Sequence, residues 1–318
     1  MPKVSVIVPV FGVEKYIERC ARSLFEQTLD DIEYLFIDDC TPDLSIEILQ
    51  QVLEEYPQRK QQVTIHRMEK NSGQAAVRKW GILNATGEYV IHCDSDDWVD
   101  TDMYRAMYEK AIEENADVVV CDYTVHDGNE VLEIVHGCHN KDINGFRYNL
   151  LLQRDRWSLC NKLFRRTTYY KDIIFPKVNL GEDMVLTNQL MFRCSNMAYI
   201  SKTYYFYYYN NLSITKIRDF SKHIRNFEDM RENTDLLIGL LKREKIEHKK
   251  WIINGLQYAV TKNLYYVMHG NKKYRDLWLN TYPYFYLRYI INPYVDIKSR
   301  IKCFLALVGI YPLKKDRL

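Results

Sequence analysis

The sequence lacks the features that mark several broad classes of protein. No stretch reaches the roughly 18 uncharged apolar residues of a membrane-spanning helix. The formal net charge of the 318 residues is only +2, which argues against a nucleic-acid-binding protein. The eight cysteines form no CxxC pair, and the apolar run near the N-terminus is too short for a secretion signal. We therefore expect free thiols in a reducing cytoplasm.

Motifs that bind phosphate or zinc are also missing. Neither GxxxxGK(S/T) nor GxGxxG follows the first apolar run, Val4–Val10, which excludes a P-loop and a dinucleotide-binding fingerprint. His136, Cys138 and His139 are residue types that ligate zinc, but no second ligand pair follows at a suitable spacing. We therefore expect no zinc site at this point of the chain.

The sequence does contain an alternation of strand-like and helix-like segments. The strand-like runs are short, apolar and rich in β-branched residues, as in strands buried on both faces. The alternation predicts an α/β protein with right-handed βαβ units and a mostly parallel sheet flanked by helices. Strands are expected at residues 4–10, 33–38, 63–67, 88–93 and 117–123, and helices at 14–27, 44–56, 74–84 and 103–114.

The pattern loosens after residue 123. We expect loops with one hairpin strand over residues 124–145, and a strand with a turn over 204–215. Helices are expected at 144–152, 181–192, 220–242 and 251–269. This change of pattern predicts two domains, residues 1–215 and a helical C-terminal region at 216–318.

Polar clusters follow three of the expected strands. They are Pro9-Val10-Phe11-Gly12, Asp38-Asp39 and Asp94-Ser95-Asp96-Asp97. In open α/β sheets, ligands bind beyond the carboxyl ends of the strands, so these clusters should meet at one edge. Aspartates also cap helices and form turns, but closely spaced carboxylates repel one another. A hard divalent cation explains the acidic cluster better.

Five segments resemble, in order, the successive motifs of the family-2 inverting glycosyltransferases, which have the GT-A (Rossmann-like) fold. They are VSVIVPVF, FIDDCTPD, NSGQAAVRKWGILNATGEYVIHCDSDDWVDTDM, NKLFRR and GEDM. The resemblance runs from Val4 to about Thr215 and is not matched in the C-terminal third. It implies transfer of a sugar from a nucleotide-sugar donor, with UDP as the expected carrier, to a hydroxyl of a glycan or lipid-linked acceptor. The expected setting is surface polysaccharide biosynthesis.

The resemblance also implies roles for individual residues around the nucleotide. Phe11 would pack on the base, and Asp39 would accept a hydrogen bond from uracil. Asp96 would bind the metal cofactor, Mn²⁺ or Mg²⁺, with Asp97 as the second candidate. The full set of implied nucleotide-binding residues is Pro9, Phe11, Asp38, Asp39, Asn71, Gly73, Arg78, Asp94 and Ser95.

The downstream motifs supply the implied catalytic base and the sugar-binding side. Asp183, in GEDM, matches the base that takes the proton of the acceptor hydroxyl. Asn161, Lys162 and Glu182 would lie on the acceptor or donor-sugar side. Because acidic residues also stabilise helix N-termini, a purely structural role for Glu182 and Asp183 stays open.

The sequence departs from the family pattern at two positions. Cys40 stands where the family commonly has glycine, which affects the geometry of that turn, and Gly12 stands where asparagine is common.

One alternative function is that of a nucleotidyltransferase, but VPVFGVEKY lacks the basic, glycine-rich loop expected after its first strand. The other alternative is a non-catalytic module that binds a nucleotide sugar.

The C-terminal tail differs from the rest of the chain in charge and aromatic content. Residues 272–318 hold ten Lys/Arg, three Asp/Glu and ten aromatics, a net charge of +7, whereas residues 1–271 carry −5. The apolar stretch 303–310 lies between basic flanks and is long enough for a membrane interface. We expect peripheral attachment to the inner face of the cytoplasmic membrane, with tyrosine and tryptophan at the headgroups. The alternatives are packing on the catalytic domain or a homodimer contact.

Overall fold

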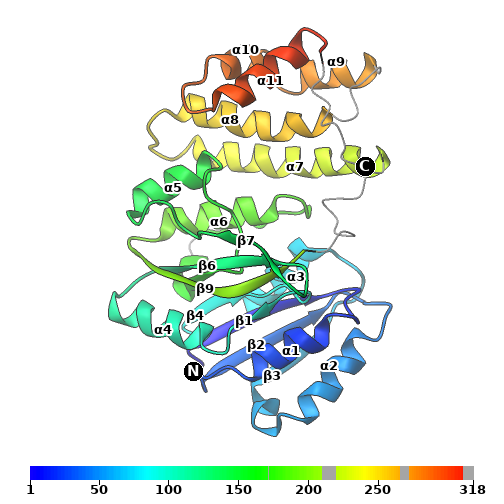
Figure 1. Ribbon diagram of the computed structural model, residues 1–318, viewed down its shortest axis with the longest axis vertical. Coiled ribbons are helices and arrows are strands. Elements are labelled where there is room, and N and C mark those ends of the chain that lie inside the picture. The colour runs from blue at the N-terminus through cyan, green and yellow to red at the C-terminus, as the bar shows by residue number, and fades with distance from the viewer. Residues whose placement is uncertain (171, 210–219, 266–271, 311–318) are drawn as a thin grey trace. The chain divides into compact units, whose positions relative to one another are not determined.

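The computed structural model describes residues 1–170, 172–209, 220–265 and 272–310 (Figure 1). The chain divides into two compact units. Unit 1 comprises Met1–Leu150 and Asp155–Asn211, and unit 2 comprises Leu151–Arg154 and Leu212–Leu318. The domain boundary expected at residue 215 lies outside the described residues.

Four parallel strands form the first part of the sheet in unit 1. They are β1 (Val4–Val10), β2 (Ile32–Asp38), β3 (Val63–Arg67) and β4 (Tyr89–His92), hydrogen-bonded in the order β3-β2-β1-β4. Val4 pairs with Ile32 on one side and with Tyr89 on the other. The parallel arrangement predicted from the βαβ pattern is confirmed for these strands, so their carboxyl ends lie along one edge of the sheet.

Side chains of β1 enter two separate hydrophobic cores, because successive side chains of a strand point to opposite faces. Val6 and Val8 pack with α1 (Ile17–Phe25), α2 (Ser45–Glu54) and α4 (Met103–Glu113). Ile7 packs on the other face with α3 (Gln74–Asn84), α5 (Ile143–Leu151) and α6 (Glu182–Arg193). The continuous apolar run VSVIVPV is therefore explained by helices on both faces of the sheet.

The second part of the sheet is mixed. β8 (Lys162–Arg165) lies between β4 and β6 (Val118–His126) and is antiparallel to both, whereas β9 (Met197–Tyr208) runs parallel to β6. The expected hairpin strand is β7 (Val131–Val135), and the two-residue β5 (Trp98–Val99) pairs with β9. The sequence analysis assigned no strand to NKLFRR, because four strand residues are too few for a clear alternation. Two 3₁₀ helices, η1 (Pro57–Gln62) and η2 (Arg166–Tyr170), follow α2 and β8.

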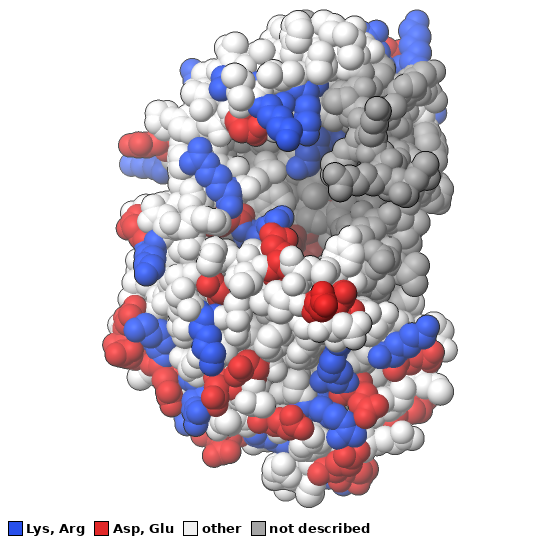
Figure 2. All heavy atoms as spheres, viewed as in Figure 1, with Lys and Arg blue, Asp and Glu red and all other residues white. Residues whose placement is uncertain are grey.

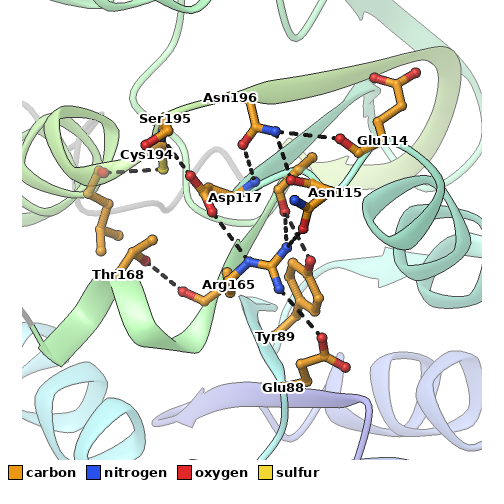
Figure 3. A network of polar contacts seen from close by, with 12 residues as sticks. Glu88, Tyr89, Glu114, Asn115, Asp117, Arg165, Thr168, Cys194, Ser195 and Asn196 are labelled. Atoms are coloured by element: carbon orange, nitrogen blue, oxygen red, sulfur yellow. Dashed lines mark hydrogen bonds and ion pairs between the residues drawn. The ribbon is translucent and has the colours of Figure 1, made fainter.

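Arg165, at the end of β8, joins this inserted strand to its neighbours (Figure 3). Its Nε lies 3.3 Å from Oδ1 of Asp117, and its Nη2 donates to Oδ1 of Asn115 at 3.0 Å. Its Nη1 lies 3.6 Å from Oε1 of Glu88, and its guanidinium carbon lies 5.0 Å from the centre of the Tyr89 ring. A single arginine thus contacts both the start of β4 and the turn before β6, which supports β8 in its position.

Unit 2 is helical in the residues that the structure describes. Its helices are α7 (Phe220–Leu241), α8 (Lys249–Thr261), η3 (Lys262–Leu264), α9 (Lys272–Thr281), α10 (Phe285–Ile290) and α11 (Ile297–Leu307). The helix expected over 251–269 ends at Thr261, and residues 266–271 lie outside the described residues. Within the described ranges, no helix combines the length and the hydropathy needed to cross a membrane.

The aromatic residues of the tail form the core of unit 2. Trp278, Tyr282, Phe285 and Tyr289 are at most 9% exposed and pack together with α7 and α8. The expected placement of Trp278, Tyr282 and Tyr289 at lipid headgroups is therefore wrong, because these rings are enclosed by their own unit. Tyr284, by contrast, is 66% exposed.

Candidate active site

The acidic loop after β4 is anchored through Asp94. Its Oδ1 accepts hydrogen bonds from Nη2 of Arg78 at 2.8 Å and from Nε2 of Gln74 at 3.2 Å, both on α3. Its backbone N–H donates to the hydroxyl of Tyr205 on β9 at 3.1 Å. The loop is thus held from both sides, by a helix that packs on the sheet and by a strand of the mixed part.

Arg78 connects this loop to the start of α6. Its Nε lies 2.9 Å from Oε1 of Glu182, and both residues are 4% exposed. Burial raises the pKa of Glu182 to about 8, although the neighbouring Arg78 lowers it. The buried ion pairs of Arg78 bring the motif GEDM beside the motif DSDD, which lies more than 80 positions earlier in the sequence.

Asp183 occupies the first turn of α6, next to Glu182. Its side chain is half-buried, and its Oδ1 accepts a hydrogen bond from the backbone N–H of Met184 at 2.7 Å. Burial raises the pKa of Asp183 above its ordinary value, and the negative charge of Asp94 raises it further. Gly181 precedes the helix with φ +85°, a left-handed conformation that glycine adopts without strain. A carboxylate with a raised pKa suits a group that must accept a proton.

Asp96 and Asp97 have different surroundings although they are adjacent. Asp96 is half-buried, and no other residue in the described chain donates a hydrogen bond to its carboxylate. Burial and the charge of Asp94 raise its pKa to about 6. Asp97 is fully buried, accepts a hydrogen bond from the Tyr205 hydroxyl, and accepts another from the Tyr208 backbone N–H at 2.7 Å. Asp97 therefore joins the loop to β9.

The mutual repulsion of Asp94 and Asp96 provides a test of whether a divalent cation fits here. The negative charge of Asp94 helps to raise the pKa of Asp96, and a bound cation would relieve this repulsion. In the described part of the chain, no cluster of three or more His, Cys, Asp or Glu residues is arranged to hold a metal ion. A cation bound by these two residues would need oxygen ligands from water or from a diphosphate, as is usual for Mg²⁺.

Asp38 and Asp39, at the end of β2, shape the neighbouring loops. Asp39 accepts hydrogen bonds from the backbone N–H groups of Ser72 at 2.7 Å and of Gly73 at 2.8 Å. Asp38 accepts one from the Thr41 N–H at 2.7 Å and forms an ion pair with Arg67. Asp39 therefore holds the segment that contains Asn71 and Gly73 against the edge of the sheet, where the sequence analysis placed them.

Two backbone conformations at this edge have physical consequences. Gly73 has φ +81°, and a Cβ added there would lie 2.4 Å from the Asn179 side chain, so both conformation and space require glycine. Cys40 has φ +58°. The turn therefore keeps the left-handed geometry that glycine adopts freely, although a non-glycine residue destabilises it by roughly 1–2 kcal/mol.

The residues after β1 leave an aromatic ring accessible. Phe11 is 48% exposed, an unusual exposure for a residue that directly follows a fully buried strand end. Gly12 has φ +68°, and its N–H donates to the Thr41 hydroxyl at 2.8 Å. Pro9 is half-buried, Ser95 is buried and Asn71 is exposed. The aromatic ring of Phe11 is therefore accessible to solvent beside the carboxyl end of β1.

Asn161 and Lys162 are buried in the interior of unit 1. Nζ of Lys162 donates to the carbonyl oxygens of Arg156 at 3.0 Å and Ser158 at 2.7 Å, and to Oδ1 of Asn161 at 2.9 Å. Nδ2 of Asn161 donates to the carbonyl of Cys121 at 2.7 Å. Burial lowers the pKa of Lys162 to about 8. These bonds fold the segment before β8, and both side chains are fully enclosed.

Sequence reasoning missed an arginine and two aromatic residues beside the acidic loop. The guanidinium carbon of Arg19, on α1, lies 3.6 Å from the centre of the Trp98 ring, and its Nη2 donates to the carbonyl of Asp96 at 3.2 Å. Tyr208 lies 5.0 Å from the same guanidinium. The buried residues of α1 keep their helical spacing around Arg19, so the sequence pattern carried no signal for it. Acidic and basic side chains are interspersed over the lower part of the face shown in Figure 2.

Comparison with known proteins now identifies the family. Residues 5–204 match the family model described as glycosyl transferase family 2, which covers the fold and the acidic loops just described. The chain belongs to glycosyl transferase family 2. The family assignment made from the sequence motifs is thus confirmed.

The curated relatives include glycosyltransferases from several bacteria. The chain is 26% identical over 226 residues to glycosyltransferase GlyA of Streptococcus pneumoniae, covering 68% of this chain and 32% of GlyA. It is 40% identical over 124 residues to the uncharacterized glycosyltransferase EpsJ of Bacillus subtilis, covering 39% of this chain and 34% of EpsJ. The chain therefore spans about a third of the length of these two relatives. It is also 26% identical over 290 residues to the uncharacterized glycosyltransferase YibD of Escherichia coli, covering 86% and 81%.

Solved structures resemble the whole described fold. Residues 1–349 of S. aureus TarS, in complex with UDP-GlcNAc, give a TM-score of 0.73 at 21% identity, covering 97% of this chain and 88% of that one. A mannosyltransferase from Pyrobaculum calidifontis, in complex with GDP-Man and Mn²⁺, gives 0.53 at 14% identity, covering 99% and 88%. At these identities the likeness concerns the fold, and the expected GT-A-type fold with a helical C-terminal region is confirmed.

Proposed function

We propose that this protein transfers a sugar from a UDP-sugar donor to a hydroxyl group of a glycan or lipid-linked acceptor, with inversion at the anomeric carbon. Family membership supports sugar transfer, and the TarS structures with UDP-GlcNAc and UDP support a UDP-linked donor. The observation that carries the proposal is the buried bridge from Asp94 through Arg78 to Glu182, which sets Asp183 beside the acidic loop. The proposed cellular role is assembly of a surface polysaccharide.

The leaving nucleoside diphosphate requires neutralisation of its negative charge. Asp96, with Asp94, would hold Mn²⁺ or Mg²⁺, which would act as a Lewis acid toward the diphosphate. The mannosyltransferase structure with Mn²⁺ supports a divalent cation in a related fold. The exposed ring of Phe11 would pack on the base, and Asp39 would accept a hydrogen bond from uracil while continuing to hold Ser72 and Gly73.

Proton transfer from the acceptor hydroxyl is assigned to Asp183. A hydroxyl group is a weak nucleophile near neutral pH, and a carboxylate within hydrogen-bond reach can remove its proton during attack. Attack from the side opposite the leaving diphosphate inverts the configuration in one displacement. A single base is sufficient for such a reaction, whereas a retaining mechanism uses two carboxylates and a covalent intermediate. In this proposal Glu182 takes no part in proton transfer. Its contact with Arg78 orients the first turn of α6.

The substitution Asp183→Asn tests the proposal directly. We expect UDP affinity to stay unchanged and the rate of transfer to fall by about 10²–10⁴-fold, the usual contribution of a general base. Calorimetry of UDP binding and single-turnover transfer from a UDP-sugar are the measurements. Asp102→Asn is the matched control, because Asp102 stands at the start of α4 and its carboxylate accepts hydrogen bonds from Arg105 and Thr28. Equal transfer rates in the two variants would show that Asp183 merely stabilises its helix.

We also propose that unit 2 attaches to an anionic membrane surface through α11. Ile297, Ile301, Phe304 and Val308 follow one another at helical spacing, and each is 49–69% exposed. Cys303, on the opposite face, is fully buried in unit 2. An exposed apolar stripe on a surface helix marks an interaction site, and exposed cations beside it favour anionic lipids. On α11 itself, Lys298 is exposed and Lys302 is half-buried.

A second copy of the chain is the other occupant that this stripe would suit. The positive charge of the neighbouring side chains argues against it, because two identical basic surfaces repel each other. A membrane location would place the protein close to a lipid-linked acceptor.

A further inference from the structure

Unit 2 contains a cavity of about 520 Å³ whose lining residues all belong to that unit. The segment 151–154, one face of α8 and the segment from Tyr289 to Ser299 enclose it. Four aromatic side chains contribute to the lining: Trp251, Tyr258, Tyr289 and Tyr294. A cavity of this volume lies within the range of small-ligand sites, which is about 300–1,000 Å³.

The aromatic wall is rigid. The rings of Tyr258 and Tyr289 stack with centroids 3.7 Å apart and an angle of 16° between their planes. Asn292, which is fully buried, donates from Nδ2 to the carbonyl of Trp251 at 2.9 Å and accepts from the Tyr294 N–H at 3.1 Å. One asparagine thus positions the backbone of the two remaining aromatic residues, so the wall is formed before any ligand arrives.

Polar groups of several kinds reach the same space. Gln153 and Ser299 offer an amide and a hydroxyl group, while Arg154 and Lys262 supply positive charge. Asp296 is the lining residue with a negative charge, and it caps α11 by accepting a hydrogen bond from the Ser299 N–H at 2.9 Å. A mixture of flat aromatic surfaces and neutral hydrogen-bonding groups suits a ligand that is itself polar at its edges and apolar on its faces.

Gly255 keeps the cavity open. It lies in the middle of α8, where glycine destabilises a helix by roughly 0.5–1 kcal/mol relative to alanine. A Cβ at Gly255 would meet no heavy atom within 4 Å, so packing does not require glycine there. Its carbonyl accepts a hydrogen bond from Nε2 of Gln153 at 3.3 Å, and Gln153 has the left-handed φ of +60°. The glycine inside the helix and the left-handed backbone of Gln153 each lower the stability of the fold, and both residues lie on the cavity wall.

We infer that this cavity is a carbohydrate-binding site that takes one or two sugar residues of a glycan. The C–H faces of a sugar ring pack on aromatic side chains such as the half-buried Trp251 and Tyr294, and its hydroxyl groups match the amide of Gln153 and the charged groups of Arg154 and Asp296. A lipid chain would suit a lining without these polar groups and charges, and a nucleotide would compete with the sugar in the test below, which contains saturating UDP. The inference goes beyond the proposed transfer, because it adds a second site that takes no part in the chemistry and does not depend on Asp183.

The test measures sugar binding by the full chain in saturation-transfer NMR. The probes are cellobiose, maltose, lactose and N,N′-diacetylchitobiose, each with saturating UDP and Mg²⁺ so that nucleotide sites are occupied. We expect at least one disaccharide to bind. Gly255→Leu should weaken its binding by about tenfold or more, since the new side chain extends into the cavity. Gly239→Leu is the matched control, because Gly239 is also a helical glycine with nothing within 4 Å of its Cβ position.

A second variant, Gln153→Gly, tests the same cavity if Gly255→Leu does not fold. Gln153→Gly relieves the left-handed backbone and removes the amide from the cavity, so it should fold well and bind the sugar more weakly. Binding retained in both cavity variants overturns the inference, as does equal weakening by Gly255→Leu and Gly239→Leu. Absence of binding by every disaccharide also overturns it. Asp183→Asn should bind the disaccharide as the unchanged protein does, so loss of transfer and loss of this site are separable.

Discussion

Nη2 of Arg78 lies 2.8 Å from Oδ1 of Asp94, so a buried arginine in the middle of α3 holds the carboxylate that follows β4. The same guanidinium reaches Glu182 at the start of α6. Three segments from distant parts of the sequence thus share one cation. A buried charge of this kind is stable only while its partners are present, which makes the contact a suitable starting point for experiments.

Replacing Arg78 should destabilise the fold strongly. In Arg78→Met, Asp94 and Glu182 lose the buried cation that both contact, and we expect the free energy of unfolding to fall by about 3–5 kcal/mol. Urea denaturation is the measurement. Arg67→Met is the control, because the Arg67 side chain is 64% exposed and its ion pair with Asp38 should contribute less than about 1 kcal/mol. A similar loss in both variants would contradict the special position of Arg78.

Asp96 and Asp97 should respond differently to the same substitution. Asp97→Ala leaves the Tyr205 hydroxyl and the Tyr208 N–H without their acceptor, at about 1–3 kcal/mol for each unpaired buried group. Asp96→Ala removes no such bond and relieves the repulsion from Asp94, so the free energy of unfolding should not fall. Instead, UDP binding should lose its dependence on Mn²⁺. Thermal unfolding and calorimetry with and without Mn²⁺ check both statements, and metal-dependent binding in Asp96→Ala would refute the metal assignment.

The raised pKa of Glu182 predicts how stability depends on pH. Burial shifts this pKa from its ordinary value of 4.5 to about 8, so between these values the folded protein binds more protons than the unfolded chain. The free energy of unfolding should therefore fall as pH rises from about 5 to about 8, by at most about 1.4 kcal/mol per pH unit. Glu182→Gln should flatten this slope, whereas Glu47→Gln, at an exposed site on α2, should not. Urea titrations at several pH values decide, and an unchanged slope in Glu182→Gln would contradict the assignment.

The apolar stripe of α11 predicts binding to anionic vesicles. Burying one isoleucine stabilises by roughly 1.5–3 kcal/mol, so Ile301→Asp should reduce co-sedimentation with phosphatidylglycerol vesicles by about tenfold or more. Leu83→Asp is the control, because Leu83 is a 62% exposed leucine of unit 1. High salt should weaken binding of the unchanged protein. If the protein stays in the supernatant at low salt and elutes as a dimer that Ile301→Asp disrupts, the stripe contacts a second copy instead.

Local pattern was sufficient to predict the parallel part of the sheet and its helices. The run VSVIVPV is apolar on both faces. A strand needs apolar side chains on both faces when helices cover both sides of its sheet. β8 was not predictable in this way, because its four residues carry too little pattern and its neighbours β4 and β6 are far away in sequence. Pairing between such distant segments depends on the whole fold.

The sequence by itself determined the family, the parallel strands and the identity of the acidic clusters, since each of these resides in short segments. The tertiary structure decided which contacts each aspartate of the acidic clusters makes. Asp97 bonds to β9, Asp39 holds the Ser72–Gly73 backbone, and Asn161 and Lys162 are enclosed in the interior. It also decided that Trp278, Tyr282, Phe285 and Tyr289 are buried in a core while Tyr284 is exposed, because burial depends on which helices pack together. Composition alone does not contain that information.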